Sequence, residues 1–203
     1  MSRRIERWAP AVALMGALLC VGSLPCHAAV PSCNKTPAEC VAQEVQRLLA
    51  QIESIAHAIS TLKDKMYDLK KRAESLSKQL KEVAAQKPVE PVRREGESDA
   101  DWNKRLSAYN QVKAAYESKC AELNRDLDLA KSEIETVVVA VNTLDNKIQS
   151  AYKQIDLLVT MLKTTDPRRT TLAEARQRLT EGRDGLLVGR QRLLQTLKLL
   201  PNP

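Results

Sequence analysis

Large aromatic rings are scarce in this sequence. Phenylalanine is absent from its 203 residues, which include only two tryptophans and four tyrosines. Most globular cores depend on such rings, so a compact core of the usual kind is poorly supplied. Alanine, leucine, lysine, glutamate, glutamine and arginine are abundant instead, and they suit long helices. The composition therefore predicts an all-α protein.

Groups that commonly perform catalysis are also rare. Only two histidines are present, and the one beyond residue 28 is His57, which lies on the expected solvent side of a helix. No glycine-rich phosphate loop follows a strand, and the acidic i,i+2 pairs face different sides of a helix. We therefore expect no catalytic residue, no cofactor and no metal site, and we predict that the protein is not an enzyme.

The first 28 residues have the pattern of a secretory signal peptide. Three arginines, at positions 3, 4 and 7, precede the apolar run APAVALMGALLCVGSL. Cys26 and Ala28 stand at the −3 and −1 positions of a cleavage site. The run is short for a membrane span, although an uncleaved anchor is the alternative. We predict export from a bacterial cytoplasm and a periplasmic or secreted mature protein.

Cysteine usage agrees with export. Cys33 and Cys40 bracket six residues within the N-terminal segment 29–40, and in an oxidising compartment a local disulfide between them is the preferred interpretation. Loop closure would make it worth about 2–2.5 kcal/mol. A metal site is the alternative, but no histidine lies nearby. Cys120 lies on the apolar face of a helix, where we expect a buried thiol rather than an intermolecular bridge.

A heptad pattern predicts a long coiled-coil hairpin over residues 41–165. Two helices, about 38–87 and 98–165, are separated by the proline-containing turn 88–97. Apolar residues alternate at steps of four and three through both helices, a pattern specific for coiled coils. Lys113 alone breaks the second seam. Trp102, Tyr109 and Tyr116 share one heptad position near the turn, which indicates either core packing or a docking surface at the hairpin tip.

Helix lengths suggest where a third helix packs. A tight turn would place residue 87 opposite 98 and residue 38 opposite 147, so the second helix would overhang the first over 148–162. A third helix, 170–200, capped by Thr170 or Thr171, can fold back over this overhang. The three helices would then overlap only near 136–147. The expected fold is a long antiparallel coiled-coil hairpin whose third, C-terminal helix packs back on the overhanging second helix.

The C-terminal helix carries the excess positive charge of the mature chain. Eight basic and three acidic residues follow Pro167, whereas residues 29–167 hold equal numbers of each. Its arginines recur every seven residues at Arg169, Arg176, Arg183 and Arg190. Its leucines keep the same step, at 172, 179, 186, 193 and 200. The small residues Ala175, Gly182, Gly189 and Thr196 occupy the other seam position, where they suit close approach of a neighbouring helix.

Three classes of function agree with these features. The preferred one is a structural or adaptor component of the bacterial cell envelope or of a secretion assembly, whose partners are other envelope proteins. The second is a periplasmic holdase chaperone. The third is a protein that binds anionic lipid or cell-wall polymer through the arginine-rich helix. We expect no nucleic-acid partner, and homo-oligomerisation through the coiled coil is a further alternative.

Overall fold

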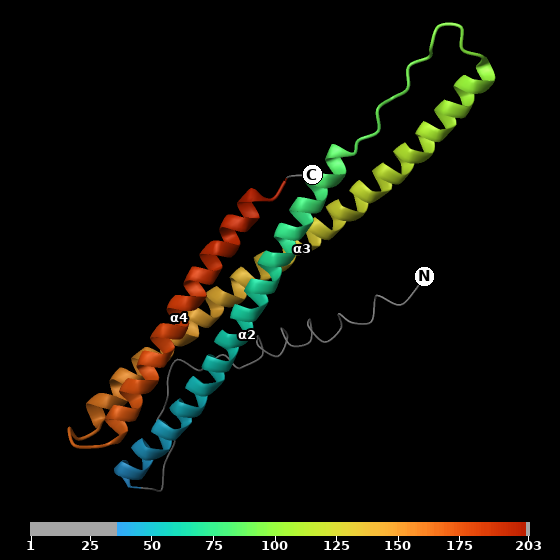
Figure 1. Cartoon of the computed structure of the whole chain (residues 1–203). Coiled ribbons are helices and arrows are strands. Elements are labelled where there is room, and N and C mark those ends of the chain that lie inside the picture. The colour runs from blue at the N-terminus through green and yellow to red at the C-terminus, as the bar shows by residue number, and fades with distance from the viewer. Residues whose placement is uncertain (1–35, 202–203) are drawn as a thin grey trace. The chain divides into compact units, whose positions relative to one another are not determined.

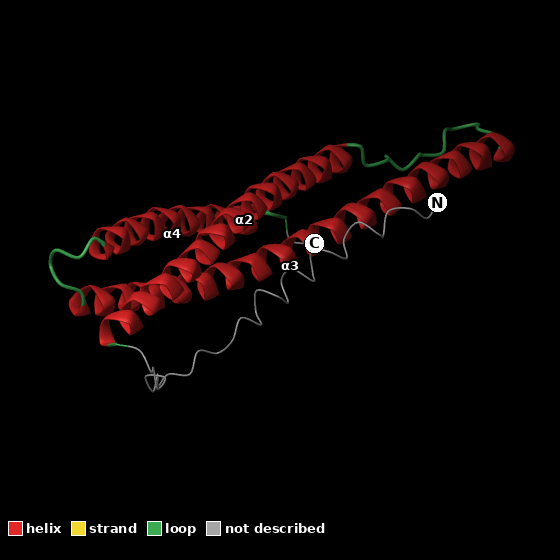
Figure 2. Cartoon of the chain, turned by 90° about the horizontal axis from the view of Figure 1, so that it is seen from below, coloured by secondary structure: helices red, strands yellow, loops and turns green. Residues whose placement is uncertain are grey.

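The structure, a computed structural model, describes residues 36–201 and contains three helices and no strand within that range. They are α2 (Pro37–Ala85), α3 (Asp99–Met161) and α4 (Arg168–Leu199). From Val41 onward they belong to one compact unit. In this unit α3 runs antiparallel to α2, and α4 turns back along α3 (Figures 1 and 2). The predicted all-α hairpin with a third helix packed back is confirmed. The predicted signal peptide, 1–28, lies outside the described residues.

Side chains at the helix starts satisfy the first free backbone N–H groups. Thr36 and Glu39 form a reciprocal capping box at α2, and the Ser98 hydroxyl accepts from the Asp101 N–H at α3. The prediction of a threonine cap for α4 is wrong, because that helix begins two residues earlier, directly after Pro167. There the Asp166 carboxylate accepts from the Arg168 N–H at 2.9 Å. The Arg168 guanidinium also pairs with this carboxylate and lowers the pKa of Asp166 to about 2.

The register of α2 against α3 differs from the one expected for a tight turn. Arg72 Nη1 lies 3.3 Å from Glu133 Oε2, whereas a turn pairing residue 87 with 98 would place Arg72 opposite Lys113. The predicted register is wrong by about 20 residues. Residues 86–98, which we call the linker, do not reverse the chain at once but run along α3 (Figure 1). Pro88 and Pro91 lack backbone N–H groups, so this segment cannot continue the helix.

Because of this shift, three helices share a core over nearly the whole length of α4. Lys131 Nζ donates to the Pro201 carbonyl at 3.0 Å, close to the C-terminal end of α4. At the other end, Arg169 donates to the Leu162 carbonyl. The three-helix section therefore spans residues 131–162 of α3, and the predicted overlap limited to 136–147 is wrong. Its fully buried side chains include Leu48, Ile134, Ile148, Ile155, Leu172, Leu179, Leu186 and Leu193.

The glycines of α4 face α2. A Cβ added at Gly182 would lie 2.9 Å from Ile59 Cδ1, and one added at Gly189 would lie 2.7 Å from Met66 Cε. The small residues thus allow α4 to approach α2, while the leucines at 172, 179, 186 and 193 are each 1% exposed or less. The close backbone approach of α4 is to α3, whereas its glycines leave room for the Ile59 and Met66 side chains of α2.

Two glycine substitutions are expected to have opposite effects on stability. At Gly185 an added Cβ meets only the end of the Lys63 side chain, which can swing into solvent. Gly185→Ala should therefore raise the free energy of unfolding by up to about 1 kcal/mol through helix propensity. Gly182→Leu must displace Ile59, which is 5% exposed, and should lower it by about 1–3 kcal/mol. Urea unfolding followed by circular dichroism measures both, and equal effects would contradict this placement of α4.

Candidate functional site

The N-terminal part of α3 extends beyond the end of α2. With Arg72 opposite Glu133, Ala85 lies thirteen residues further on, opposite about Cys120. The first buried residue of α3 is Leu123. We call residues 99–122 the overhang; these 24 residues are about 36 Å long at 1.5 Å per residue. Within the described part of the chain, the linker is the segment that runs beside it (Figures 1 and 2).

A row of apolar residues continues along the overhang, although α2 does not extend far enough to face it. Trp102, Tyr109 and Tyr116 occupy one heptad position, and Leu106 and Cys120 occupy the other. All five are half-buried rather than buried, and Lys113 stands between them with its side chain 50% exposed. Core packing of the three rings against the first helix, which we expected as one alternative, does not occur. α2 therefore leaves this apolar row uncovered.

Arg105 fastens the linker to the overhang. Its Nε and Nη2 donate to the two carboxylate oxygens of Glu97 at 2.7 and 2.6 Å, and Nη2 also donates to the Val92 carbonyl at 3.1 Å. The same guanidinium lies 5.5 Å from the centroid of the Trp102 ring, within cation–π range. The hydrogen bond from Arg105 holds the pKa of Glu97 below its usual value near 4.5. Sequence reasoning missed this clamp, because Val92 and Glu97 lie in the linker, which has no heptad periodicity.

Removing the clamp should free the linker without unfolding the bundle. For Arg105→Gln we expect faster amide exchange and faster proteolysis within residues 86–98, while the melting of the helices changes little. Acid should have the same effect on the unmodified protein. Because the pKa of Glu97 is lowered, its ion pair with Arg105 stabilises the attached linker fully above about pH 4.5. This stabilisation is lost as the pH falls through the lowered pKa. Lys104→Gln is the matched control, and an unchanged linker in Arg105→Gln would contradict the clamp.

The cysteines have different environments. Cys40 is disulfide-bonded; its predicted partner, Cys33, lies outside the described residues, so the pairing of these two remains a prediction. Cys120 is free and half-buried, so the expectation of a buried thiol is wrong, because α2 ends beside it. A hydrogen bond with Cys120 raises the pKa of Tyr116, which places the phenol and the thiol side by side on the overhang.

Most of the predicted arginine row serves contacts within the bundle. Arg176 pairs with Asp156, and Arg183 pairs with Asp145 at 2.5 Å, both across the α3–α4 interface. This pairing with Asp145 raises the pKa of Arg183. Arg169 donates a hydrogen bond to the Leu162 carbonyl. The Nε atom of Arg190 is buried without a hydrogen-bond partner among the described residues. The row is therefore mainly a structural feature of the bundle and not a free cationic strip.

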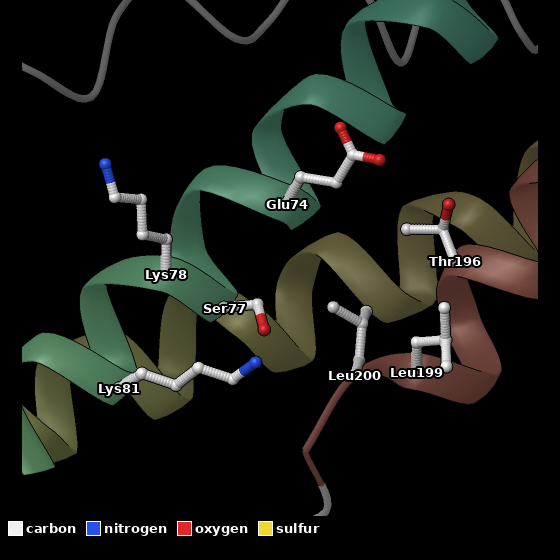
Figure 3. A pocket seen from close by; sticks show the side chains of 7 residues that line it. All are labelled: Glu74, Ser77, Lys78, Lys81, Thr196, Leu199 and Leu200. Atoms are coloured by element: carbon white, nitrogen blue, oxygen red, sulfur yellow. The ribbon is translucent and has the colours of Figure 1, made fainter.

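A groove lies at the end of the three-helix section. It has a volume of about 250 Å³ and lies between α2 and the last turn of α4 (Figure 3). Its lining residues are Glu74, Ser77, Lys78, Lys81, Thr196, Leu199 and Leu200. Leu199 is 82% exposed. The groove marks the point where α4 ends while α2 and α3 continue.

The chain matches no protein-family model, no curated protein and no solved structure. Among residues 36–201, no cluster of three or more histidine, cysteine or acidic side chains could hold a metal ion. None of the three described helices is long and apolar enough to cross a membrane.

Proposed function

We propose that this protein is an exported, non-enzymatic coiled-coil component of the bacterial cell envelope or of a secretion assembly. It acts as a structural or adaptor element in the periplasm, and its docking element is the overhang. The observation that carries the proposal is a seam of rings on α3 that α2 does not cover. The signal-peptide pattern of residues 1–28 and the disulfide at Cys40 support a periplasmic localisation.

The design of the chain supports an adaptor. The three-helix section stabilises the base of α3, and the overhang presents Trp102, Tyr109 and Tyr116 away from it. Tryptophan and tyrosine are enriched in the energetically dominant parts of protein interfaces, since they bury large areas with few rotatable bonds. The linker beside them is held in place by Arg105, so the surface is ordered before a partner arrives.

The two other functions have less support. An anionic surface would bind free arginines, but Arg176 and Arg183 already have carboxylate partners. A holdase chaperone would need broad apolar surface on its arms, and on the three-helix section the apolar seam residues are buried. The apolar row on the overhang is narrow.

Site-specific photocrosslinking in intact cells tests the proposal. A photoreactive residue at Tyr109 should yield specific adducts with envelope proteins or with the protein itself in the periplasmic fraction. The same residue at Asn146, an exposed position on the three-helix section, is the matched control. The proposal fails if the protein stays in the cytoplasm, or if the two positions give the same adducts.

A further inference from the structure

We propose that the occupant of the overhang seam is the overhang of a second copy of this chain, packed antiparallel to form a two-fold symmetric dimer. The inference rests on the proposed function and names the partner of its docking element. Three observations support it. One edge of the overhang is exposed, its seam residues are complementary to the same seam in antiparallel orientation, and opposite charges lie at its two ends.

The free edge of the overhang continues the position that α4 occupies on the bundle. On α3, Glu133 faces α2, whereas Asp145 and Tyr152 face α4. Arg105 is four heptads before Glu133 and holds the linker, so the linker continues the α2 side. The edge that contains Asp145 and Tyr152 continues, seven residues at a time, to Glu117, Asn110 and Asn103. All three are exposed, and two of them are uncharged amides that a neighbouring helix can approach.

The seam is complementary to itself when reversed. Antiparallel coiled coils join each position of one seam row to the other row of the partner helix. We centre the antiparallel pair near residue 111. The facing seam pairs are then Trp102 with Cys120 of the second copy, Leu106 with Tyr116, and Tyr109 with Lys113. Two-fold symmetry makes each pair occur twice. The lysine that breaks the seam then meets the face of a tyrosine ring, a cation–π contact. The same register places Asn110 beside its own copy and Asn103 beside Glu117.

Opposite charges meet at both ends of this arrangement. The tip, residues 93–101, contains two arginines and four carboxylates, a net charge of −2. Asp99 pairs with Arg93 in its own chain. In the antiparallel register it reaches the level of Leu123 of the other copy, where α2 carries Lys78, Lys81 and Glu82. Both lysines line the groove at the end of α4 (Figure 3). Glu74 of this groove pairs with Lys70, and Lys78 pairs with Glu82, so Lys81 is the groove cation available to the tip. The tip of each copy therefore approaches the basic groove of the other.

The space available agrees with this register. α4 ends near the level of Lys131 on α3, as the contact with Pro201 shows. The first helical residue of the second copy would lie about eight residues short of that level. This leaves about 12 Å, at 1.5 Å per residue, for the tip loop that precedes Asp99. A register one heptad longer would bring the tip loop into the end of α4.

Sedimentation equilibrium on the purified full chain tests the dimer. We expect twice the mass of one chain at micromolar concentration, and a weaker dimer at high salt because the end contacts are charged. Leu106→Asp should raise the dissociation constant at least about 100-fold, because a carboxylate would be buried in the seam. Its helix content should be retained, since Leu106 lies outside the three-helix section. Val112→Asp, at a 58% exposed position, is the matched control.

Crosslinking tests the direction and register. Trp102→Cys should crosslink to Cys120 of the second copy under oxidation or with a short bis-maleimide, giving a covalent dimer. Lys104→Cys, at an exposed position that faces away from the seam, should not. In the unmodified protein the two Cys120 thiols lie about 18 residues apart along the pair and should stay free. A Cys120–Cys120 bridge in the unmodified protein would indicate a parallel pair and overturn the proposal. A monomer at all concentrations would also overturn it, while crosslinks from Tyr109 to other envelope proteins would leave the adaptor function intact.

Discussion

Leu186→Asp should detach α4 from the bundle. Leu186 is 1% exposed and lies in the middle of the three-helix section. A carboxylate there would have to lose its hydration without a cationic partner, which costs several kcal/mol in proteins. We expect a loss of at least about 3–5 kcal/mol in the free energy of unfolding, from the buried charge together with the lost leucine. Thermal and urea unfolding measure the loss, and rapid proteolysis after residue 167 should accompany it.

Val188→Asp is the matched control for this substitution. Val188 lies two residues further along α4 and is 49% exposed, so the same carboxylate remains hydrated. We expect a change within about 0.5–1 kcal/mol, as is usual for surface sites. If Val188→Asp and Leu186→Asp destabilise the protein equally, α4 does not pack with its leucine row inward.

Ile148→Ala and Leu106→Ala should differ strongly although both residues belong to the same heptad seam of α3. Ile148 is fully buried between the other helices, and its truncation should cost about 2–5 kcal/mol, as for other buried isoleucines. Leu106 lies on the overhang, which α2 does not reach, so its truncation should cost about 1 kcal/mol or less in a monomer. Chemical unfolding at concentrations below the dimer dissociation constant measures both values.

The opposite outcome has a clear meaning. With the tight turn first expected from the sequence, Leu106 would pack inside a two-helix coiled coil, and Ile148 would lie beyond the end of the first helix. Leu106→Ala would then be at least as costly as Ile148→Ala. Such a result would contradict the register in which Arg72 pairs with Glu133.

The heptad pattern was sufficient to predict the helices. Steps of four and three place the seam residues on one face of each helix, and breakers such as Pro88 and Pro167 mark the ends within a few residues. The small residues at Gly182 and Gly189 also indicated a close helix neighbour. These features depend on neighbours in sequence, which is why they could be recognised without a structure.

The register and the site could not be predicted in the same way. A heptad seam pairs equally well after a shift of seven residues, so the connection between the two helices decides the register. A tight turn is the geometry expected from the sequence for this connection. The clamp of Arg105, Glu97 and Val92 holds the linker along α3 instead. The ion pairs of Arg176 and Arg183 were missed as well, because their acidic partners become neighbours only in the folded chain.

Distance measurement by pulsed electron paramagnetic resonance tests the central claim, which is that α2 ends near Cys120 and leaves the overhang uncovered. In a Cys120→Ser background, nitroxides at positions 72 and 133 should give a short distance, below about 20 Å. Nitroxides at 72 and 113 should lie about 30 Å apart, since the two α3 positions are 20 residues apart at 1.5 Å each. A short distance for 72–113 and a long one for 72–133 would contradict the account.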